Sequence, residues 1–473
     1  MNTLTIAWIA LPLFAGFLIY LIPKIDRYLA LGVTLASLGY ALQILLNNLQ
    51  LTLQLLDNFG VTLQVDALSA YFILTNALVA TGVILYCWHN KTAFFYMQLI
   101  ILHGSLNAVF VCADFMSLYV ALEVIGIAAF LLIAYPRTER SIWVALRYLF
   151  ISNTAMLFYL VGAVLVYQTH HSFAFAGLRG APTEALALIF LGLLTKGGVF
   201  VSGLWLPLTH SESESPVSAM LSGVVVKAGV FPLLRCALIL DEVGVIVRIF
   251  GVAAALIGAF YAILERDTKR TLALSTISQL GWILAAPSAG GLYALAHGLG
   301  KSTLFLVAGN LPSRQFKELR QTPINTTLWA IMVVAGLSIS GFPLLVGFEA
   351  KMLTLNDVPP LYEIALNVAA AGTAIVYAKF IFLPHSRQEK TSFEWLAVVP
   401  LVTALIVANV VYPQAYTVAN IVKVLAIIGA GWAAYLLVFR RLELRLPRAL
   451  EQFENLIGGM SLMLIILFWM VFT

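Results

Sequence analysis

Apolar segments of about 20 residues recur along the whole chain, from Leu4 to Phe472, and only short polar stretches separate them. A helix of that length rises about 30 Å, which matches the hydrocarbon core of a bilayer. Because 61% of the 473 residues are hydrophobic and only 10% are charged, water is not the main solvent of this chain. We therefore predict an all-α polytopic membrane protein with about 14–16 transmembrane helices. The predicted spans are residues 4–23, 28–47, 67–88, 94–112, 115–135, 141–167, 184–206, 216–238, 243–265, 271–287, 290–310, 327–355, 359–384, 395–412, 417–438 and 456–473.

The basic residues indicate how the spans are oriented. Lysine and arginine gather in alternate loops, for example around Lys24, Arg137, Arg266 and Arg440, while the intervening loops carry almost none. Because positively charged loops stay on the inner side of a membrane, both termini are predicted to lie outside. The first span, residues 4–22, has no basic segment before it and no cleavage site after it, so we expect it to be retained rather than removed as a signal peptide.

Charge and motifs argue against several other classes of function. The net charge of +5 reflects basic loops between spans, so we expect no nucleic-acid binding. Cys87, Cys112 and Cys236 have neither CxxC nor paired spacing, and we therefore expect no iron–sulfur cluster, disulfide framework or other metal site. The chain also has no Walker loop and no GxGxxG signature. We expect no cofactor and no catalytic site on this chain, and assign any redox or nucleotide chemistry to another subunit.

Four segments depart from the simple helical pattern. The stretch LTLQLLDNFGVTLQVD, within residues 50–66, alternates apolar and polar residues around Asn58-Phe59-Gly60 and predicts a small outside β-hairpin. Trp205-Leu206-Pro207 is predicted to end the seventh span, and Gly341-Phe342-Pro343 to interrupt the twelfth. A broken helix exposes backbone groups that an ion path can use, whereas a proline kink can also have no role. The acidic inside loop, His210 to Ser215, either attracts cations or is a solvated loop.

Six ionisable side chains lie inside apolar spans, where a charge at the bilayer centre costs at least about 2.5–3.5 kcal/mol. Burial makes a lysine release its proton more readily, and a nearby carboxylate reverses that effect. At about 4 Å and an effective dielectric constant near 20, such a pair interacts by about 4 kcal/mol. Moving one charge across about 200 mV requires a similar amount, about 4.6 kcal/mol. The candidates for a proton path are Glu123, Lys196, Lys227, His297, Lys301 and Lys351.

Each candidate also has a purely structural interpretation. Glu123 and Lys196 form either a switch that loads and unloads a proton or a static ion pair. Lys301 and Lys351 can instead extend their ammonium groups to a membrane interface. His297 can be a hydrogen-bonded histidine that only packs helices together.

A series of motifs in this order resembles a known family, the antiporter-like subunits of complex I and of the Mrp cation/proton antiporter. The similarity covers about residues 67–385. It implies two inverted five-helix repeats, each with a broken helix, in residues 94–240 and 241–385. N-terminal spans with the hairpin precede them in residues 1–93, and C-terminal spans follow in residues 386–473. The motifs are DFMSLYVALE, YPRTERSIWVALRYLFISNTAMLFYLVG, KGGVFVSGLWLP, SPVSAMLSGVVVKAGVFPLLR, RDTKRTLALSTISQLGWIL, HGLGKSTLFLVAG and SGFPLLVGFEAKML.

The resemblance also implies roles for the buried charges, residue by residue. Two sequence features depart from the family pattern. Leu208-Thr209 stand before the histidine of the inside loop, where the family often has Asp-Ala, and the last two spans lie beyond the usual fourteen. The implied roles are a gating glutamate for Glu123, a broken-helix lysine for Lys196, a bridging lysine for Lys227, a second-repeat pair for Lys301 and His297, and a terminal lysine for Lys351.

The stretch GVVVKAGVF and the lysine at position 351 make the chain most similar to the D-type subunit of the Mrp antiporter. One complex I subunit has an acid at that position, although another also has a lysine there. The resemblance thus implies an ion-translocating subunit of a multisubunit Na⁺/proton antiporter in a bacterial cytoplasmic membrane. The alternative is a proton-pumping membrane-arm subunit of an NADH- or ferredoxin-quinone oxidoreductase, which also allows a thylakoid membrane. A third interpretation is a non-conducting scaffold. Expected partners are other membrane subunits of a large hetero-oligomeric complex, protons, Na⁺ and the lipid bilayer.

Overall fold

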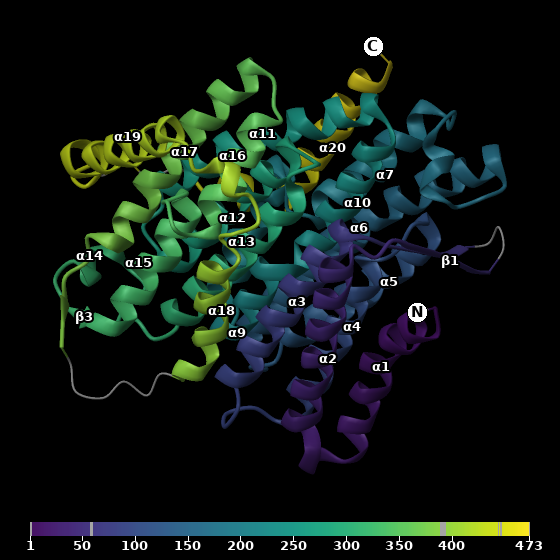
Figure 1. The fold of residues 1–473 in the computed structure, drawn as a ribbon, viewed down its shortest axis with the longest axis horizontal. Coiled ribbons are helices and arrows are strands. Elements are labelled where there is room, and N and C mark those ends of the chain that lie inside the picture. Colours follow the sequence, from purple (N-terminus) through teal and green to yellow (C-terminus); the bar gives the residue numbers. More distant parts are fainter. Residues whose placement is uncertain (1, 57–59, 388–393, 443, 445–446, 473) are drawn as a thin grey trace.

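The computed structural model describes residues 2–56, 60–387, 394–442, 444 and 447–472, and helices dominate it (Figure 1). Eleven helices in the described part are long and apolar enough to cross a membrane, and three shorter apolar helices accompany them. Each predicted span has one to three helical segments at its place in the chain. The prediction of an all-α polytopic membrane protein is therefore confirmed.

The N-terminal part carries the predicted hairpin. Its strands pair antiparallel, with Leu53 opposite Leu63. Asn58 and Phe59 of the predicted turn lie outside the described residues. Asp114, at the start of the fifth span, accepts a hydrogen bond from the backbone N–H of Thr62 at 2.8 Å, so the hairpin is tied to the helices below it. The elements are α1 (Asn2–Leu21), α2 (Asp26–Asn47), β1 (Leu51–Leu56), β2 (Gly60–Val65) and α3 (Ala67–Tyr86).

Two groups of helices follow, one for each predicted repeat. The repeat boundaries, 94–240 and 241–385, are not tested by any observation and stay predictions. The first group comprises α4 (Ala93–Val109), α5 (Phe115–Ile133), α6 (Glu139–His170), α7 (Thr183–Lys196), η3 (Phe200–Trp205), α8 (Leu206–Glu212), α9 (Ser215–Met220), η4 (Leu221–Val225) and α10 (Lys227–Ile239). The second comprises α11 (Asp241–Leu264), α12 (Thr268–Ala285), α13 (Gly290–Ala308), α14 (Phe316–Leu319), α15 (Thr326–Ser340), α16 (Val346–Asn356) and α17 (Pro360–Ile381).

The C-terminal helices contact widely separated parts of the molecule. α18 (Trp395–Val407) packs against α3 and α13, and α19 (Val418–Ala434), which continues into the π-helical turn η6 (Tyr435–Phe439), packs against α17. α20 (Phe453–Phe472) instead returns to α7 and η3 of the first group. Figure 1 shows α19 and α20 well apart, so the chain between them crosses from one group to the other.

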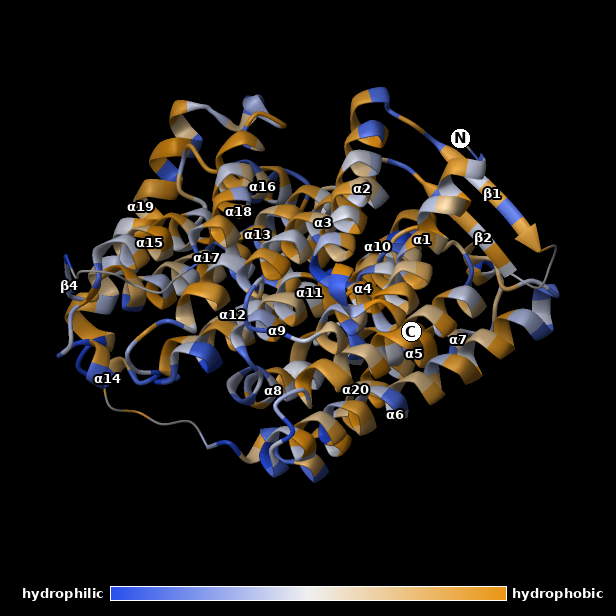
Figure 2. Cartoon of the chain, turned by 90° about the horizontal axis from the view of Figure 1, so that it is seen from below, coloured by the Kyte–Doolittle hydropathy of each residue, from blue (hydrophilic) through white to orange (hydrophobic). Residues whose placement is uncertain are grey.

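Polarity and burial are distributed as a membrane protein requires. Every residue of α12 and α13 is buried, and α12 is rich in polar residues. In the apolar stretches of α1, α19 and α20 that are long enough to cross a membrane, only 33%, 22% and 22% of the residues are buried. The exposed residues of these stretches are largely apolar (Figure 2). Because charged groups are costly in lipid, the ionisable side chains concentrate in the helices that protein surrounds.

Both predicted helix breaks exist, but one of them lies elsewhere in the chain. α7 ends at Lys196, and Gly198 has a φ of +65°, a conformation that glycine adopts without strain. Pro207 stands in the first turn of α8, where proline is well tolerated. The prediction that residues 205–207 break the seventh span was therefore wrong, because the glycines directly after Lys196 end it. The second break is confirmed, since α15 ends at Ser340 and Gly341 has a φ of +85°.

Candidate functional site

Lys196 lies at the first break, in the last position of α7, and is 4% exposed. Its Nζ donates a hydrogen bond to Ser152 Oγ of α6 at 2.6 Å. Across from it, a Cβ atom on Gly126 of α5 would lie only 3.1 Å from Nζ, so this glycine provides the space for the ammonium group.

Glu123 stands one helical turn before Gly126 on α5, and its charge acts on Lys196. Among the described residues, however, no direct ion pair joins the two side chains. The buried Oε1 atom of Glu123 and the nearby hydroxyl of Tyr148 have no hydrogen-bond partner. A static, fully satisfied ion pair would occupy these atoms, so the geometry favours two groups that interact without being locked together.

Lys227 follows the π-helical turn η4, and its side chain is completely buried. Its Nζ contacts the backbone oxygen of Gly223, four residues earlier, and lies 3.1 Å from Nδ1 of His297 on α13. The structure thus pairs His297 with Lys227 of the first group, whereas the resemblance grouped it with Lys301. π-Helical turns are uncommon and occur often at functional sites.

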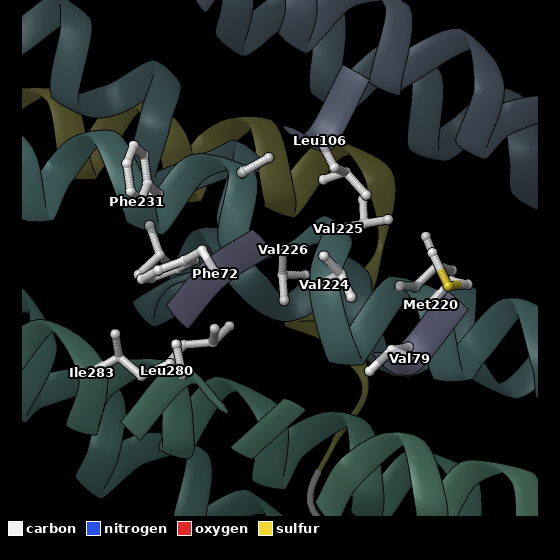
Figure 3. Close-up of a cluster of buried hydrophobic side chains, with 14 of the residues drawn as sticks. Phe72, Val79, Leu106, Met220, Val224, Val225, Val226, Phe231, Leu280 and Ile283 are labelled. Atoms are coloured by element: carbon white, nitrogen blue, oxygen red, sulfur yellow. The ribbon is translucent and has the colours of Figure 1, made fainter. Parts of the chain in front are cut away.

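Apolar side chains surround the η4 turn and separate it from lipid and water. Figure 3 shows Val224, Val225 and Val226 beside Val79 of α3 and Leu106 of α4. Farther along the same cluster, the rings of Phe72 and Phe231 are 5.0 Å apart. The Lys227–His297 pair therefore lies next to a low-dielectric environment, where its electrostatic interactions are strong.

Lys301 and Lys351 are 0% and 2% exposed, so neither ammonium group reaches a membrane interface as the alternative interpretation required. Lys301 Nζ donates to the backbone oxygen of Leu272 at 2.8 Å and lies 5.6 Å from the ring centre of Tyr377. Lys351 Nζ donates to the oxygen of Ser340, the last residue of α15, at 3.2 Å. Both ammonium groups are thus held by backbone carbonyls inside the protein.

A small cavity of about 10 Å³, lined by both apolar and polar residues, lies between His297 and α16, the helix that carries Lys351. The buried Nε2 atom of His297 and the Oγ atom of Ser338, which both belong to residues lining it, have no hydrogen-bond partner among the described residues. Tyr293 and Gln279 complete the polar lining and are hydrogen bonded to each other at 2.7 Å. A cavity of this size with several polar groups can hold about one water molecule.

The candidates do not form one continuous series of contacts. No hydrogen bond or ion pair joins Lys196 to Lys227 in the described part of the chain. Instead, the backbones of α7 and α10 approach closely between them, since a Cβ on Gly229 would overlap the backbone nitrogen of Gly197. The structure therefore collects five candidates into two clusters, Glu123 with Lys196 and Lys227 with His297 and the cavity before Lys351, whereas Lys301 bonds separately.

The acidic segment 210–215 is neither a loop that attracts free cations nor a freely solvated loop. Helix α8 extends through Glu212, which pairs with Arg140 at 3.6 Å, while Glu214 pairs with Lys91 at 2.7 Å. His210 is fully buried, stacks on Phe305 with ring centres 4.8 Å apart, and has no hydrogen-bond partner on either ring nitrogen. This histidine lies within electrostatic reach of Lys269 and Lys301.

Sequence reasoning missed the uncharged members of the site. They are serine, glutamine and tyrosine residues, which cost little in a hydrophobic span and so give no signal comparable to a buried lysine. One usable signal was the clustering of several hydroxyl and amide residues in α12, a helix of low hydropathy within an apolar chain. The missed residues are Tyr148, Ser152, Gln279, Tyr293 and Ser338.

A family model and individual relatives both relate this chain to the same group of membrane proteins. Residues 112–376 match the family model described as NADH:quinone oxidoreductase/Mrp antiporter, transmembrane. Chain 4-2 of the NAD(P)H-quinone oxidoreductase of Synechocystis sp. is 28% identical over 78% of this chain and 75% of its own length. NADH-quinone oxidoreductase subunit N of Desulforudis audaxviator is 30% identical over 62% of this chain and 66% of its own length.

A solved structure extends the likeness to the fold. A chain in the structure of the Mrp complex from Dietzia sp. DQ12-45-1b superposes with a TM-score of 0.78 at 21% identity. The match covers 98% of this chain and 58% of that chain.

Proposed function

Because the chain belongs to the NADH:quinone oxidoreductase/Mrp antiporter transmembrane family, we propose that it is the ion-translocating subunit of a multisubunit Na⁺/proton antiporter. Protons move along the buried path formed by Glu123, Lys196, Lys227, His297 and Lys351. The protein is a multi-pass membrane protein, and we assign it to a bacterial cytoplasmic membrane with both termini outside. Its partners are other membrane subunits, and its functional counterpart is the D-type subunit of the Mrp antiporter.

The observation that carries this proposal is the contact of 3.1 Å between Lys227 and His297 in the centre of the molecule. An ammonium group and an imidazole at this distance share one hydrogen bond, and a proton can reside on either side of it. When Nδ1 accepts from Lys227, the proton of a neutral imidazole lies on Nε2, which lines the small cavity. A water molecule there would continue the path toward Lys351.

Glu123 and Lys196 form the first half of the path. Their separation leaves both groups free to change partners, and a shift of Glu123 toward or away from Lys196 changes the proton affinity of the lysine. Lys301 and His210 form a side branch of this path toward the inner surface. We propose this branch because His210 lies within electrostatic reach of Lys301 and has two unoccupied ring nitrogens.

A second candidate function is a proton-pumping membrane-arm subunit of a quinone oxidoreductase. The Synechocystis and Desulforudis relatives are quinone oxidoreductase subunits, and the family includes both kinds of protein. Purification of the intact complex distinguishes the two, because copurifying small membrane subunits without a chromophore support the antiporter. Iron–sulfur or flavin absorbance in the purified complex supports the oxidoreductase.

The test of the conducting role is proton flux in everted membrane vesicles, normalised to the amount of assembled complex. Lys227→Ala removes the central proton carrier and is expected to lower the flux by at least about tenfold, equivalent to about 1.4 kcal/mol in the barrier. Lys227→Arg keeps a charge of similar length but cannot release its proton, so its flux is expected to fall equally. Lys423→Ala, which removes a lysine from the peripheral helix α19, serves as the matched control.

Normal flux in Lys227→Arg, with normal assembly, would show that proton release from this side chain is not required. Loss of assembly in Lys227→Ala alone would leave the arginine variant as the deciding measurement. Exchange of Na⁺ is tested in the same vesicles by imposing a Na⁺ gradient and recording the internal pH.

A further inference from the structure

A pocket of about 410 Å³ opens where three loops of the predicted inside face meet beside the end of α17. It lies between the ends of α11 and α17, the short helix α14 and the turn η6, at the same end of the molecule as α19 (Figure 1). Two acidic residues, Glu265 and Glu318, also line it. Its basic residues are Arg266, Lys317, Arg320, Lys379, Arg440 and Arg441.

Among the described residues, the basic side chains of this pocket outnumber its carboxylates and make no ion pair with them. Glu265 binds Arg270 at 2.9 Å, and Glu318 contacts the hydroxyl of Ser313. Among the described residues, no carboxylate pairs with any of the six basic side chains of the pocket. Because the six basic side chains outnumber the two carboxylates, an anion bound among them would be stabilised.

Two of the cations are built into the pocket rather than extended into solvent. Lys379 is 5% exposed, and its Nζ donates to the backbone oxygens of Ala262 and Glu265 at 2.9 and 2.7 Å. An ammonium group has three N–H bonds, so one remains for a ligand. Arg320 donates to the hydroxyl of Tyr435 at 3.2 Å, and its buried Nε has no hydrogen-bond partner in the part of the chain that the structure describes.

The pocket is also continuous with surface that faces lipid. Ile263, Leu264 and Phe439 form apolar parts of its wall. Directly before Phe439, Leu437 and Val438 of η6 are 75% and 52% exposed, on a helix with the hydropathy of a membrane span. A free phosphate ion would gain nothing from such a wall, whereas the acyl chains of a lipid would.

From these features we infer that this pocket, the inner basic pocket, binds the phosphate headgroup of an anionic phospholipid whose acyl chains lie along η6 and α17. Basic pockets between transmembrane helices on the inner side of a membrane recognise such headgroups. This inference does not depend on the proposed ion path, because no residue of that path lines the pocket.

The test is native mass spectrometry of the intact complex, titrated in detergent with phosphatidylglycerol or with phosphatidylcholine of the same chain length. The triple variant Lys317→Gln/Arg440→Gln/Arg441→Gln removes three exposed charges that make no ion pair in the described part of the chain. We expect it to bind phosphatidylglycerol about tenfold more weakly, or weaker still, than the natural chain does. Lys24→Gln/Arg137→Gln removes exposed charges of the same predicted membrane side and should retain the binding.

Equal retention of phosphatidylglycerol by the triple variant and the control would overturn the inference, as would equal binding of the two lipids by the natural chain. Inorganic phosphate and glycerol phosphate, added as competitors, distinguish a lipid from a small anion. Full displacement of the lipid by either at millimolar concentration would identify a soluble-anion site instead. Should the triple variant fail to assemble, the single variant Arg441→Gln provides the same comparison with a smaller expected shift.

Discussion

The two helix breaks place a lysine in the same way but surround it differently. At the first break, Lys196 ends α7 and lies within reach of the charge of Glu123. At the second break, Lys351 stands inside α16 and binds the terminal oxygen of α15, with its Nζ 4.9 Å from the ring centre of Trp282. α12, which contains Trp282, has no acidic residue in its whole length.

An acidic residue does lie near the second lysine, but it serves another purpose. Glu349 is in the first turn of α16, and its Oε2 accepts a hydrogen bond from the backbone N–H of Tyr412 at 2.7 Å. A carboxylate at a helix N-terminus is stabilised by the helix dipole. The two breaks therefore share a lysine beside an interrupted helix, whereas among the described residues a carboxylate charge acts on the lysine of the first break only.

The largest expected difference in flux is between variants of the two carboxylates, Glu123 and Glu349. Glu123→Gln removes the charge that acts on Lys196 but keeps the size of the side chain, so flux should fall at least about tenfold while assembly stays normal. Glu349→Gln can still accept the hydrogen bond from Tyr412, and flux should remain above about half of normal. Vesicle flux normalised to assembled complex measures both.

A companion variant at the first break is Lys196→Arg, which should also abolish flux because arginine keeps its proton at accessible pH. If Glu123 and Lys196 were only a structural pair, Glu123→Gln would cost about 3–5 kcal/mol and reduce the amount of complex instead. Equal flux losses in Glu123→Gln and Glu349→Gln would erase the proposed distinction between the breaks.

The next effect concerns the glycines at the breaks. Gly198→Ala and Gly341→Ala each force a side chain into a left-handed conformation, which costs about 1–3 kcal/mol. The new Cβ would overlap Cδ1 of Leu206 in the first case and would lie 2.7 Å from Cδ of Lys351 in the second. Both should lower the thermal stability of the complex, and only Gly341→Ala should also displace a conducting lysine.

The flux that remains per assembled complex distinguishes these two glycine variants. We expect a lower value for Gly341→Ala than for Gly198→Ala. Similar flux in both would indicate that the stem of Lys351 adjusts without loss.

A smaller effect is expected at the cavity that leads to the second break. Ser338→Ala removes a buried hydroxyl without a hydrogen-bond partner, so stability should be unchanged or slightly higher. Flux should nevertheless fall about two- to fivefold, because the water molecule in the cavity loses one polar neighbour. Ser302→Ala, which removes a hydroxyl bonded to the oxygen of Ala219, is the control with the opposite pattern.

The smallest effect is expected for the ion pairs and hydrogen bonds that join the two groups of helices at the predicted inner surface. Arg270 of α12 binds both Glu265 and Glu451, and the backbone oxygen of Glu451 accepts from Arg147 of α6. Burial by itself would raise the pKa of Glu265, but Arg270 and two backbone N–H groups outweigh it and hold the pKa below its usual range.

The sign of the pH dependence follows from this lowered pKa. Ionised Glu265 stabilises the fold above its unfolded pKa of about 4.3, and the contribution is lost as the pH falls through the folded value. Arg270→Gln should therefore be less stable than the natural chain at pH 7, and the difference in melting temperature should narrow toward about pH 3.5. A constant difference across this range would show that the ion pair contributes nothing through Glu265.

Several features could be predicted from particular residues in the sequence. The spans followed from apolar runs, and the second break from Gly341 followed by Pro343. The first break was misplaced because Pro207 is a strong breaker in sequence, whereas Gly197 and Gly198 end the helix through backbone conformation. The resemblance grouped Lys301 with His297, yet each has a different hydrogen-bond partner.

The sequence alone specifies the membrane environment, the helical spans and the identities of the buried charges, because transfer into lipid is a sum over consecutive residues. Which of these charges meet depends on tertiary packing. Lys227 and His297 are 70 residues apart, and only the packing of α10 against its neighbours brings them to 3.1 Å. Packing also decides that Glu349 accepts a hydrogen bond from a backbone N–H and that Lys351 donates one to a backbone carbonyl. Contacts of this kind depend on helix positions that no local sequence pattern specifies.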